Sequence, residues 1–356
     1  MTTRTSPFSS LPWDKGARNY TLIAGPCSAE SEEQTLSIAK HLQAQGLRYY
    51  RASLWKPRTR PGGFEGVGYS GLPWLQRVQD ELGMQVMTEV ATTAHIEAIL
   101  AAGIRHIWIG ARTTSSPFAM AELADALQGV EDVSVLVKNP INPDINLWEG
   151  ALLRLQQAGV QHVGAIHRGF STYGETYYRN SPIWQIPIEL KLRHPELSII
   201  VDPSHIGGKR QLIEPIARTA LELHFDGLMI ETHTKPDCAL SDAEQQILPE
   251  TLACILERLG RLPDEESSSP ELEQWRAQIN LIDEQILWLL SERQQVSERI
   301  GGYKHERNMC ILQPERYRQL MRSRILQGDK LGLDKDFVHD LFSRIHEESV
   351  RLQQQQ

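Results

Sequence analysis

Five basic residues lie at the ends of short apolar runs, and their placement points to anion binding. They are Arg51, Lys56, Arg112, Lys138 and Arg168. Arg58 would add a sixth. Bringing so many cations together is unfavourable unless an anion occupies the site. Any one of them would also serve as a helix cap or as the partner of a surface acid, but that explanation is weak for all five. The pattern therefore predicts a phosphorylated, multiply anionic substrate.

A second group has the residue types that bind metal ions. Cys27, His205, Glu231 and Asp242 offer a thiol, an imidazole and two carboxylates. Such a mixed donor set suits one divalent transition ion, such as Mn, Co, Fe or Zn, without selecting among them. A lone cysteine is also a common small buried hydrophobe. From the residues alone, both interpretations stay open.

A third group of polar residues lies in the last quarter of the chain. Arg293 interrupts an apolar helical seam, where an unpaired charge is costly. Arg276, Lys304 and Arg316 are expected near the same face, and Ser349 interrupts the apolar stripe of a later helix. Register specification by a buried polar residue, or a kink that exposes it, would explain Arg293 alone. Convergence of the cations instead predicts a dianionic ligand with an apolar body.

Short β-branched segments alternate with helical segments before residue 263. The candidate strands are 20–25, 48–52, 85–90, 105–110, 133–138, 162–166, 197–202 and 227–232. Eight such repeats predict an α/β fold of the (β/α)8 TIM-barrel type. The carboxyl ends of the strands meet at one mouth in that fold, which would bring the first two groups together. A doubly wound open sheet is the alternative, although no G-x-G-x-x-G follows a strand.

The composition changes near residue 263 and indicates two domains. The segment 263–270 (PDEESSSP) is acidic, rich in serine and bounded by prolines, which is typical of a linker. We therefore expect a large domain at 1–262 and a small one at 271–356.

The small domain is predicted to be all-α with three helices. The first carries apolar residues every 3.5 positions, like a coiled-coil seam, and is expected to break at Gly301–Gly302. The other two are expected near 314–327 and 335–353. A core this thin favours an entwined homodimer, with a tetramer as the larger alternative.

The overall composition bounds the class of protein. Of 356 residues, 40% are hydrophobic and 23% charged, which is typical of a folded chain. A net charge of −8 argues against nucleic acid or an anionic membrane as a partner. Four scattered cysteines fit a reducing cytoplasm better than a disulfide framework. No signal peptide or long apolar segment is apparent, so we expect a cytoplasmic protein.

Several motifs together resemble the type I-beta 3-deoxy-D-arabino-heptulosonate 7-phosphate (DAHP) synthases. They are GPCS at 25–28, KPRT at 56–59, GAR at 110–112, DPSH at 202–205 and ALSD at 239–242. The resemblance extends over about 20–260. It implies a (β/α)8 barrel that condenses phosphoenolpyruvate with erythrose 4-phosphate, the reaction that opens the shikimate route to aromatic amino acids.

The resemblance also implies a role for each matching residue. The metal ion would be bound by Cys27, His205, Glu231 and Asp242. Phosphoenolpyruvate would be bound by Arg51, Lys56, Ala111, Arg112, Lys138 and Arg168, among which Lys56 is also a catalytic candidate. Erythrose 4-phosphate would contact Arg58, Thr59 and Asp202. The segments 113–118, 139–140 and 172–184 depart from the family pattern, which puts the contacts on the aldehyde side in question.

The helical half resembles the all-helical chorismate mutases. The similarity rests on R-x2-I-x3-D at 276–283, LLSER at 289–293, Lys304, Arg316 and ESVRLQ at 348–353. It implies that chorismate is rearranged to prephenate in a site made of Arg276, Arg293, Lys304, Arg316, Ser349 and Gln353. Arg276 would reach across a dimer, and the catalytic candidates are Arg293, Lys304 and Gln353. Tyr317 stands where many relatives carry an acid, a change expected to alter hydroxyl recognition or lower activity.

Together the two halves predict a bifunctional enzyme, a metal-dependent DAHP synthase fused to a chorismate mutase. We expect feedback inhibition by prephenate or chorismate through the helical half. One alternative is a related synthase that takes arabinose 5-phosphate. The other is a helical half that dimerises and senses an effector without catalysis.

Overall fold

The computed structural model describes residues 8–57, 62–173, 177–260 and 270–355. The chain divides into two compact units, Met1–Asp264 and Glu265–Gln356. Among the described helices, none combines the length and the apolar character that a membrane-spanning segment requires.

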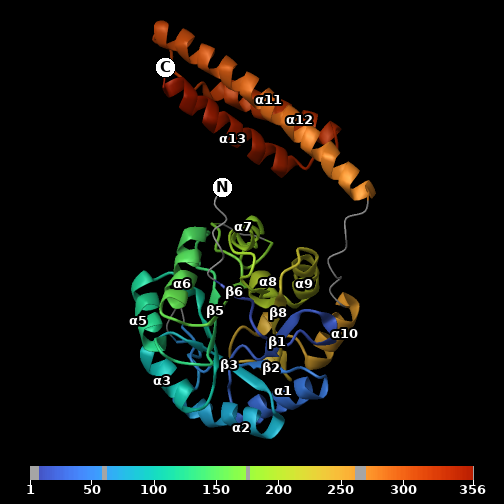
Figure 1. Cartoon of the computed structure of the whole chain (residues 1–356). Coiled ribbons are helices and arrows are strands. Elements are labelled where there is room, and N and C mark those ends of the chain that lie inside the picture. The colour runs from blue at the N-terminus through green and yellow to red at the C-terminus, as the bar shows by residue number, and fades with distance from the viewer. Residues whose placement is uncertain (1–7, 58–61, 174–176, 261–269, 356) are drawn as a thin grey trace. The chain divides into compact units, whose positions relative to one another are not determined.

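Eight parallel strands form a closed barrel in the first unit, with helices around it (Figure 1). The strands are β1 (Thr21–Gly25), β2 (Tyr49–Arg51), β3 (Gln85–Val90), β4 (His106–Ile109), β5 (Ser134–Lys138), β6 (His162–His167), β7 (Ile199–Val201) and β8 (Gly227–Glu231). β8 pairs with β1 and closes the barrel. All eight predicted strands are confirmed, with ends that differ by at most two residues. The closure excludes an open doubly wound sheet.

Helices follow the strands around the barrel. They are α1 (Glu32–Ala44), α2 (Leu72–Leu82), α3 (Thr93–Ala101), α4 (Ala111–Thr114), α5 (Pro117–Leu127), α6 (Ile145–Gln157), α7 (Gln185–Arg193), α8 (Pro203–Gly207), α9 (Ile213–Glu222) and α10 (Pro249–Leu259). Short 3-10 turns are η1 (Gly16–Arg18), η2 (Gly68–Gly71), η3 (Arg210–Leu212), η4 (Pro236–Cys238) and η5 (Ala243–Gln245). Ser31, Thr92, Ser116 and Asp144 begin α1, α3, α5 and α6 as N-caps, each accepting a backbone N–H of the first turn.

The inside of the barrel is filled by side chains and is closed at its amino-terminal end. The inner cluster consists of Leu11, Trp13, Ile23, Tyr49, Met87, Trp108, Leu136, Ile166, Ile200 and Met229. Leu11 donates its backbone N–H to Ser198 Oγ at 3.0 Å, and Trp13 Nε1 lies 3.3 Å from Ser134 Oγ. Both serines lie at the amino-terminal ends of strands, so the segment before β1 covers that end. The opposite mouth is left for ligands.

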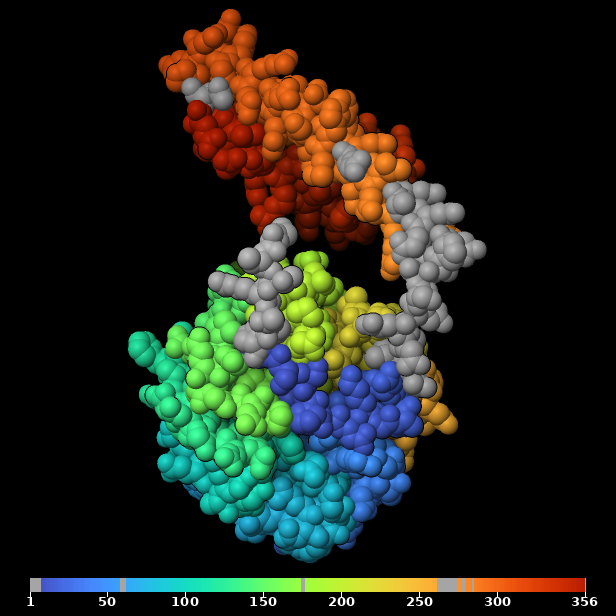
Figure 2. Space-filling view, in the orientation of Figure 1, coloured from blue at the N-terminus to red at the C-terminus, as the bar shows by residue number. Residues whose placement is uncertain are grey.

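The second unit is a bundle of three helices, α11 (Pro270–Glu306), α12 (Pro314–Lys330) and α13 (Lys335–Gln354). Both α11 and α12 pack against α13, and Figure 2 shows the orange α11 beside the red α13. The predicted break at Gly301–Gly302 is wrong, because α11 continues through both glycines. A glycine costs a helix only about 1 kcal/mol. Contacts of α11 with α13 on either side of the pair, from Arg293 and Lys304, offset that cost.

Candidate active sites

Three of the predicted metal ligands meet at the mouth of the barrel. Cys27 follows β1, Glu231 ends β8 and Asp242 precedes η5, and one ligand atom of each lies within 4.8 Å of the other two. β1 and β8 are neighbours at the closure of the barrel, which is why these distant residues meet. Cys27 and Glu231 are fully buried. Asp242 has a left-handed backbone (φ 46°), a strained conformation that clusters at functional sites.

His205, the fourth predicted ligand, adjoins this trio through Glu231, with 3.8 Å between Nε2 and Oε1. It lies in α8, which begins with Asp202 as N-cap and Pro203 in the first turn. Asp202 Oδ2 is 2.8 Å from His205 Nδ1. A carboxylate on one ring nitrogen fixes the ring and leaves the other nitrogen for a metal ion. The donor types and their spacing therefore fit a divalent transition ion.

Lys56 lies within this cluster and contacts both Cys27 Sγ and, at 3.1 Å, Asp242 Oδ2. Burial, and then Glu231, raise the pKa of the Cys27 thiol to about 12. Burial alone would lower the pKa of Lys56, but Cys27 and Asp242 hold it above its ordinary value. Burial opposes ionisation of Asp242, yet Lys56 and His205 hold its pKa well below the usual range. Lys56 is thus an ammonium and Asp242 a carboxylate at neutral pH.

A cavity of about 600 Å³ opens beside these residues. Its lining includes five of the six residues predicted to bind phosphoenolpyruvate: Lys56, Ala111, Arg112, Lys138 and Arg168. The sixth, Arg51, is fully buried. Its Nη2 is 3.0 Å from Glu231 Oε1, and its guanidinium carbon is 4.9 Å from the centroid of the Trp108 ring. The structure therefore brings the predicted cations to one mouth.

Two cations that line the cavity, Lys138 and Arg168, are held in place by their own partners. Lys138 Nζ is 3.0 Å from Asp202 Oδ2, and both side chains are buried. Arg168 Nη1 donates to Asn180 Oδ1 at 2.6 Å, while its backbone N–H donates to Asn139 Oδ1 at 2.7 Å. Burial lowers the pKa of Arg168 to about 10, so it stays charged at neutral pH.

Asp202, which the resemblance assigns to erythrose 4-phosphate, is fully buried and contacts His205 and Lys138. In the described part of the chain, Asp202 therefore orients His205 and Lys138. Arg58 and Thr59, assigned to the same substrate, lie outside the described residues.

The cavity also contains residues to which the motifs assign no role. Glu89 in β3 lines it and accepts a hydrogen bond from Trp108 Nε1 at 2.9 Å. Gly110 of the GAR motif makes room for this carboxylate, because a Cβ there would lie 2.2 Å from Glu89 Oε1. Arg179 lines the cavity as well, with Nη2 3.3 Å from Asp242 Oδ1. Glu89 could have been predicted as a site residue, because it lies at the end of a predicted strand. Arg179 lies in the atypical segment 172–184, and nothing in the sequence pattern indicated that it would line the site.

In the helical unit, α11 and α13 bring four of the predicted residues together in pairs. Arg293 contacts the Ser349 hydroxyl and donates to the Ile345 carbonyl at 3.3 Å. Lys304 Nζ is 3.1 Å from Gln353 Oε1 and also contacts the Ile311 carbonyl. Within the described part of the chain, both cations contact neutral oxygens, which leaves their charge for a ligand.

The remaining predicted residues of the helical site are not drawn into these pairs. Arg276 and Arg316 are exposed. Tyr317 has its ring 4.5 Å from that of His346, and its hydroxyl is 3.4 Å from Ser343 Oγ. Burial, and then the charges of Arg293 and Lys304, lower the pKa of His346. The sequence motifs gave no role to His346.

Comparison with protein families matches both halves of the chain. The DAHP synthetase I family matches residues 13–264, and chorismate mutase type II matches residues 275–354. The chain is 32% identical over 245 residues to the phospho-2-dehydro-3-deoxyheptonate aldolase of Thermotoga maritima, covering 69% of this chain and 70% of that protein. It is 27% identical over 275 residues to the 2-dehydro-3-deoxyphosphooctonate aldolase of Delftia acidovorans, covering 69% and 91%.

Solved structures give the same result for the barrel. A crystal structure of the Thermotoga maritima DAHP synthase superposes with a TM-score of 0.63 at 28% identity, covering 71% of this chain and 73% of that chain. A truncated form of the synthase from the same organism gives 0.60 at 26%, covering 71% and 91%. The chain therefore belongs to the DAHP synthetase I family and carries a chorismate mutase type II domain after its barrel, which makes it an enzyme with the domains of both activities.

Proposed function

We propose that the barrel condenses phosphoenolpyruvate with erythrose 4-phosphate to give DAHP and phosphate, and that the reaction depends on one divalent metal ion. The observation that carries this proposal is a single cavity in which Lys56, Arg112, Lys138 and Arg168 lie beside the donors of Cys27, Glu231 and Asp242. Phosphoenolpyruvate is a compact trianion and requires several fixed cations. The similarity to the Thermotoga maritima phospho-2-dehydro-3-deoxyheptonate aldolase supports this chemistry.

The proposed substrate contacts follow from the lining of the cavity. Arg112, Lys138, Arg168 and Lys56 bind the phosphate and carboxylate of phosphoenolpyruvate, together with Arg51 and Ala111. Arg58, Thr59 and Asp202 are proposed for erythrose 4-phosphate.

In the reaction, the enol carbon of phosphoenolpyruvate attacks the aldehyde carbon of erythrose 4-phosphate. A divalent ion held by Cys27, His205, Glu231 and Asp242 would act as a Lewis acid on the aldehyde oxygen. Lys56, kept protonated by its neighbours, stabilises the negative charge that develops on that oxygen. Water then adds to the oxocarbenium carbon, and phosphate leaves while Lys138 and Arg168 hold it.

The alternative substrate is arabinose 5-phosphate. Its support comes from the 2-dehydro-3-deoxyphosphooctonate aldolases, which are 25–28% identical to this chain, against 32% for the Thermotoga maritima protein. A chorismate mutase fused to the barrel also favours erythrose 4-phosphate, because both activities then serve one route.

The test is loss of the enol absorbance of phosphoenolpyruvate with each sugar phosphate, before and after chelation. Turnover with erythrose 4-phosphate alone, abolished by a chelator and restored by a divalent metal, is the expected result. Turnover with arabinose 5-phosphate alone, or turnover that survives complete metal removal, would refute the proposal.

For the helical unit we propose rearrangement of chorismate to prephenate. The observation that supports this proposal is that Ser349 and Gln353 hold two cations, Arg293 and Lys304. The reaction is pericyclic and needs no general base. The cations hold the two carboxylates in the diaxial conformer, and Lys304 with Gln353 stabilises charge on the ether oxygen. Arg316 completes the set proposed on this chain.

The mutase site is proposed to be completed by a second copy of the chain in a homodimer. Arg276 precedes Arg293 on the same helix by nearly five turns, about 25 Å at about 1.5 Å per residue, so it does not reach the site of its own chain. The seam of α11 is exposed in the single chain, including Ile279, Ile282 and Leu289. Burying such a face between two copies is the expected outcome.

We further propose that prephenate inhibits the barrel by binding the helical unit. Fusion of the two units would place a sensor for a downstream product on the first enzyme of its route. The alternative is that the helical unit senses prephenate or chorismate without catalysis, and chorismate turnover by the purified protein distinguishes the two. We also propose a cytoplasmic location, which the four free cysteines support.

A further inference from the structure

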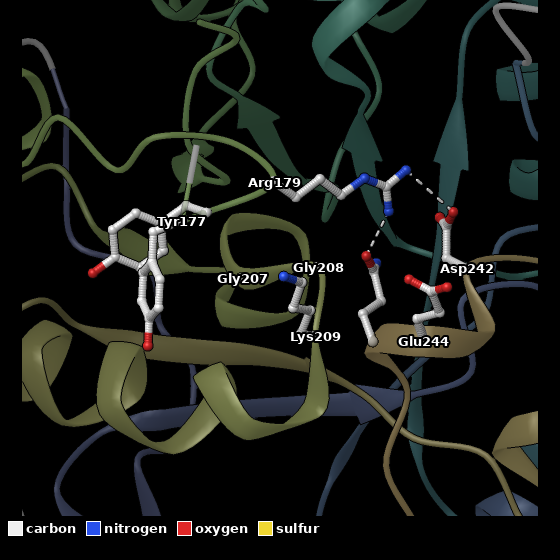
Figure 3. A pocket seen from close by; sticks show the side chains of 9 residues that line it. Tyr177, Arg179, Gly207, Gly208, Lys209, Asp242 and Glu244 are labelled. Atoms are coloured by element: carbon white, nitrogen blue, oxygen red, sulfur yellow. Dashed lines mark hydrogen bonds and ion pairs between the residues drawn. The ribbon is translucent and has the colours of Figure 1, made fainter. Parts of the chain in front are cut away.

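Behind the proposed metal ligands runs a chain of hydrogen bonds that the mechanism above does not use. Gln245, in η5, is almost completely buried, and its Nε2 donates to Glu231 Oε2 at 2.6 Å. Its Oε1 accepts from Arg179 Nη1 at 2.5 Å, and Arg179 Nη2 donates to Asp242 Oδ1 at 3.3 Å. Two of the four proposed ligands, Glu231 and Asp242, are thereby linked by one amide and one guanidinium. The dashed line from Arg179 to Asp242 in Figure 3 marks one of these bonds.

These bonds divide the carboxylate oxygens into two sets. Glu231 Oε2 and Asp242 Oδ1 accept from the chain of Gln245 and Arg179. The other oxygens face the remaining site residues. Asp242 Oδ2 is 3.1 Å from Lys56 Nζ and 3.3 Å from Cys27 Sγ, and Glu231 Oε1 is 3.0 Å from Arg51 Nη2 and 3.8 Å from His205 Nε2. Each carboxylate therefore turns one oxygen toward the cations and metal-donor side chains of the site, while Gln245 or Arg179 binds the other oxygen.

Arg179 packs closely against the backbone of Gly207 and Gly208. Its backbone N–H donates to the Gly207 carbonyl at 3.3 Å. Gly208 has φ +66°, and a Cβ there would lie 2.5 Å from Arg179 Cβ. Figure 3 shows the side chain extending from this loop toward Asp242, along a second cavity of about 420 Å³ that Lys209 also lines.

We propose that Gln245 and Arg179 are positioning residues for the metal centre, which hold Glu231 and Asp242 so that each binds the ion through a single oxygen. The proposal rests on the metal site proposed above. Hydrogen bonds to the ligands of a metal fix their orientation, and their loss typically weakens metal binding by about 10- to 100-fold.

The experiment is a titration of the metal-free full-length protein with Co²⁺, followed by absorption spectroscopy. A bound thiolate gives a charge-transfer band, and the visible d–d bands report the arrangement of the ligands. Gln245→Met keeps the length of the side chain without its hydrogen bonds, and Arg179→Lys keeps the charge without the fork. Lys209→Gln removes a cation from the same second cavity and serves as the matched control, while Cys27→Ser is the reference for the thiolate band.

We expect Gln245→Met and Arg179→Lys to keep the charge-transfer band, to change the d–d bands and to bind Co²⁺ about 10- to 100-fold more weakly. Lys209→Gln should behave as the unmodified protein does. Unchanged affinity and spectra in both variants would overturn the positioning role alone. Absence of a thiolate band in the unmodified protein, or its survival in Cys27→Ser, would overturn the metal site and this proposal with it. If Gln245→Met does not fold, the half-exposed Arg179 still decides the question.

Discussion

The residues of the helical site show how a cation is prepared for a ligand. Arg293 is partly buried against α13, and burial followed by the charge of Arg324 lowers its pKa from the ordinary value. Its contacts with Ser349 and the Ile345 carbonyl orient the guanidinium without neutralising it. A carboxylate of the substrate would therefore find a fixed, unneutralised partner.

Replacing Arg293 should thus remove catalysis and leave the fold. We predict that Arg293→Ala lowers kcat/KM for chorismate by about 100- to 1000-fold, the range seen when one charge-stabilising donor is removed. The far-ultraviolet circular dichroism and the oligomeric state should not change. Arg299→Ala, an exposed arginine on the same helix, is the control. Chorismate turnover close to that of the control would rule out the assigned role.

His167 at the end of β6 provides a pH-dependent contribution to stability. It is fully buried beside Trp148, Phe170 and Trp184, and burial lowers its pKa to about 3. Its pKa in the unfolded chain is about 6.5. Below pH 6.5 the unfolded chain binds a proton that the folded barrel does not, so stability is complete above pH 6.5 and decreases as the pH falls toward 3.

We predict that the free energy of unfolding of the unmodified protein falls by about 2 kcal/mol more between pH 7 and pH 5 than that of His167→Phe, at 1.36 kcal/mol per pH unit below 6.5. Phenylalanine fits the aromatic surroundings and cannot titrate. Urea unfolding at the two pH values measures the difference. The same pH dependence in both proteins would contradict the pKa assigned to His167.

At the scale of elements, the geometry of the mouth depends on the contact between β1 and β2. Gly25 at the end of β1 has φ +150°, and a Cβ there would lie 2.0 Å from the Arg51 carbonyl oxygen. No side chain fits between the strands at this point. The glycine of the GPCS motif thus sets the position of Arg51 and, two residues later, of Cys27.

Gly25→Ala should therefore push the two strand ends apart. We expect the free energy of unfolding to fall by roughly 1–3 kcal/mol, as for other overpacked cores, and metal affinity to fall as well, because Cys27 moves. Chemical unfolding and Co²⁺ titration measure the two effects. Gly46→Ala serves as a control for glycines with positive φ, because its Cβ meets nothing within 4 Å. An equal effect of both substitutions would attribute the loss to backbone strain alone.

The strands were predictable because each is a local apolar run, and the barrel then dictates which ends meet. For the same reason the basic residues that follow the strands lie at one mouth, beside Cys27 and Glu231. The covering of the barrel by Leu11 and Trp13 was not predictable, because it depends on serines more than a hundred residues away. Arg179 was missed because an arginine in an irregular segment looks like any surface cation, and its role depends on packing against Gly208.

At the scale of the whole molecule, the division into two units predicts separable activities. We expect a chain truncated after Asp264 to condense phosphoenolpyruvate with erythrose 4-phosphate and to be insensitive to prephenate. The barrel and its surrounding helices share one buried hydrophobic core within the first unit, so this unit is expected to fold without the helical one. Initial rates with and without prephenate, for the full-length and truncated chains, are the measurement. Inhibition of the truncated chain by prephenate would show that the effector binds the barrel.

The exposed seam of α11 predicts how the copies associate. Ile282 and Ile286 are about half exposed on the single chain. Substituting both by glutamate should yield a monomer by sedimentation velocity, together with loss of chorismate turnover, because Arg276 would no longer reach a partner's site. The control is Gln285→Glu, which adds a charge at a neighbouring exposed position outside the seam. A fully active monomer would refute the shared site.

The closure of the barrel also fixes an order of events during synthesis. The edge of β1 that pairs with β8 has no partner until β8, some two hundred residues later, has been synthesised. The segment around Leu11 and Trp13 likewise requires Ser134 at the start of β5 and Ser198 just before β7. Every strand and helix of the barrel is encoded before α11 begins. Domains generally fold as units during translation, at about 5–20 residues per second. The synthase half therefore has several seconds to assemble while α11, α12 and α13 are still being made, and the proposed homodimer would join chains whose barrels are already closed.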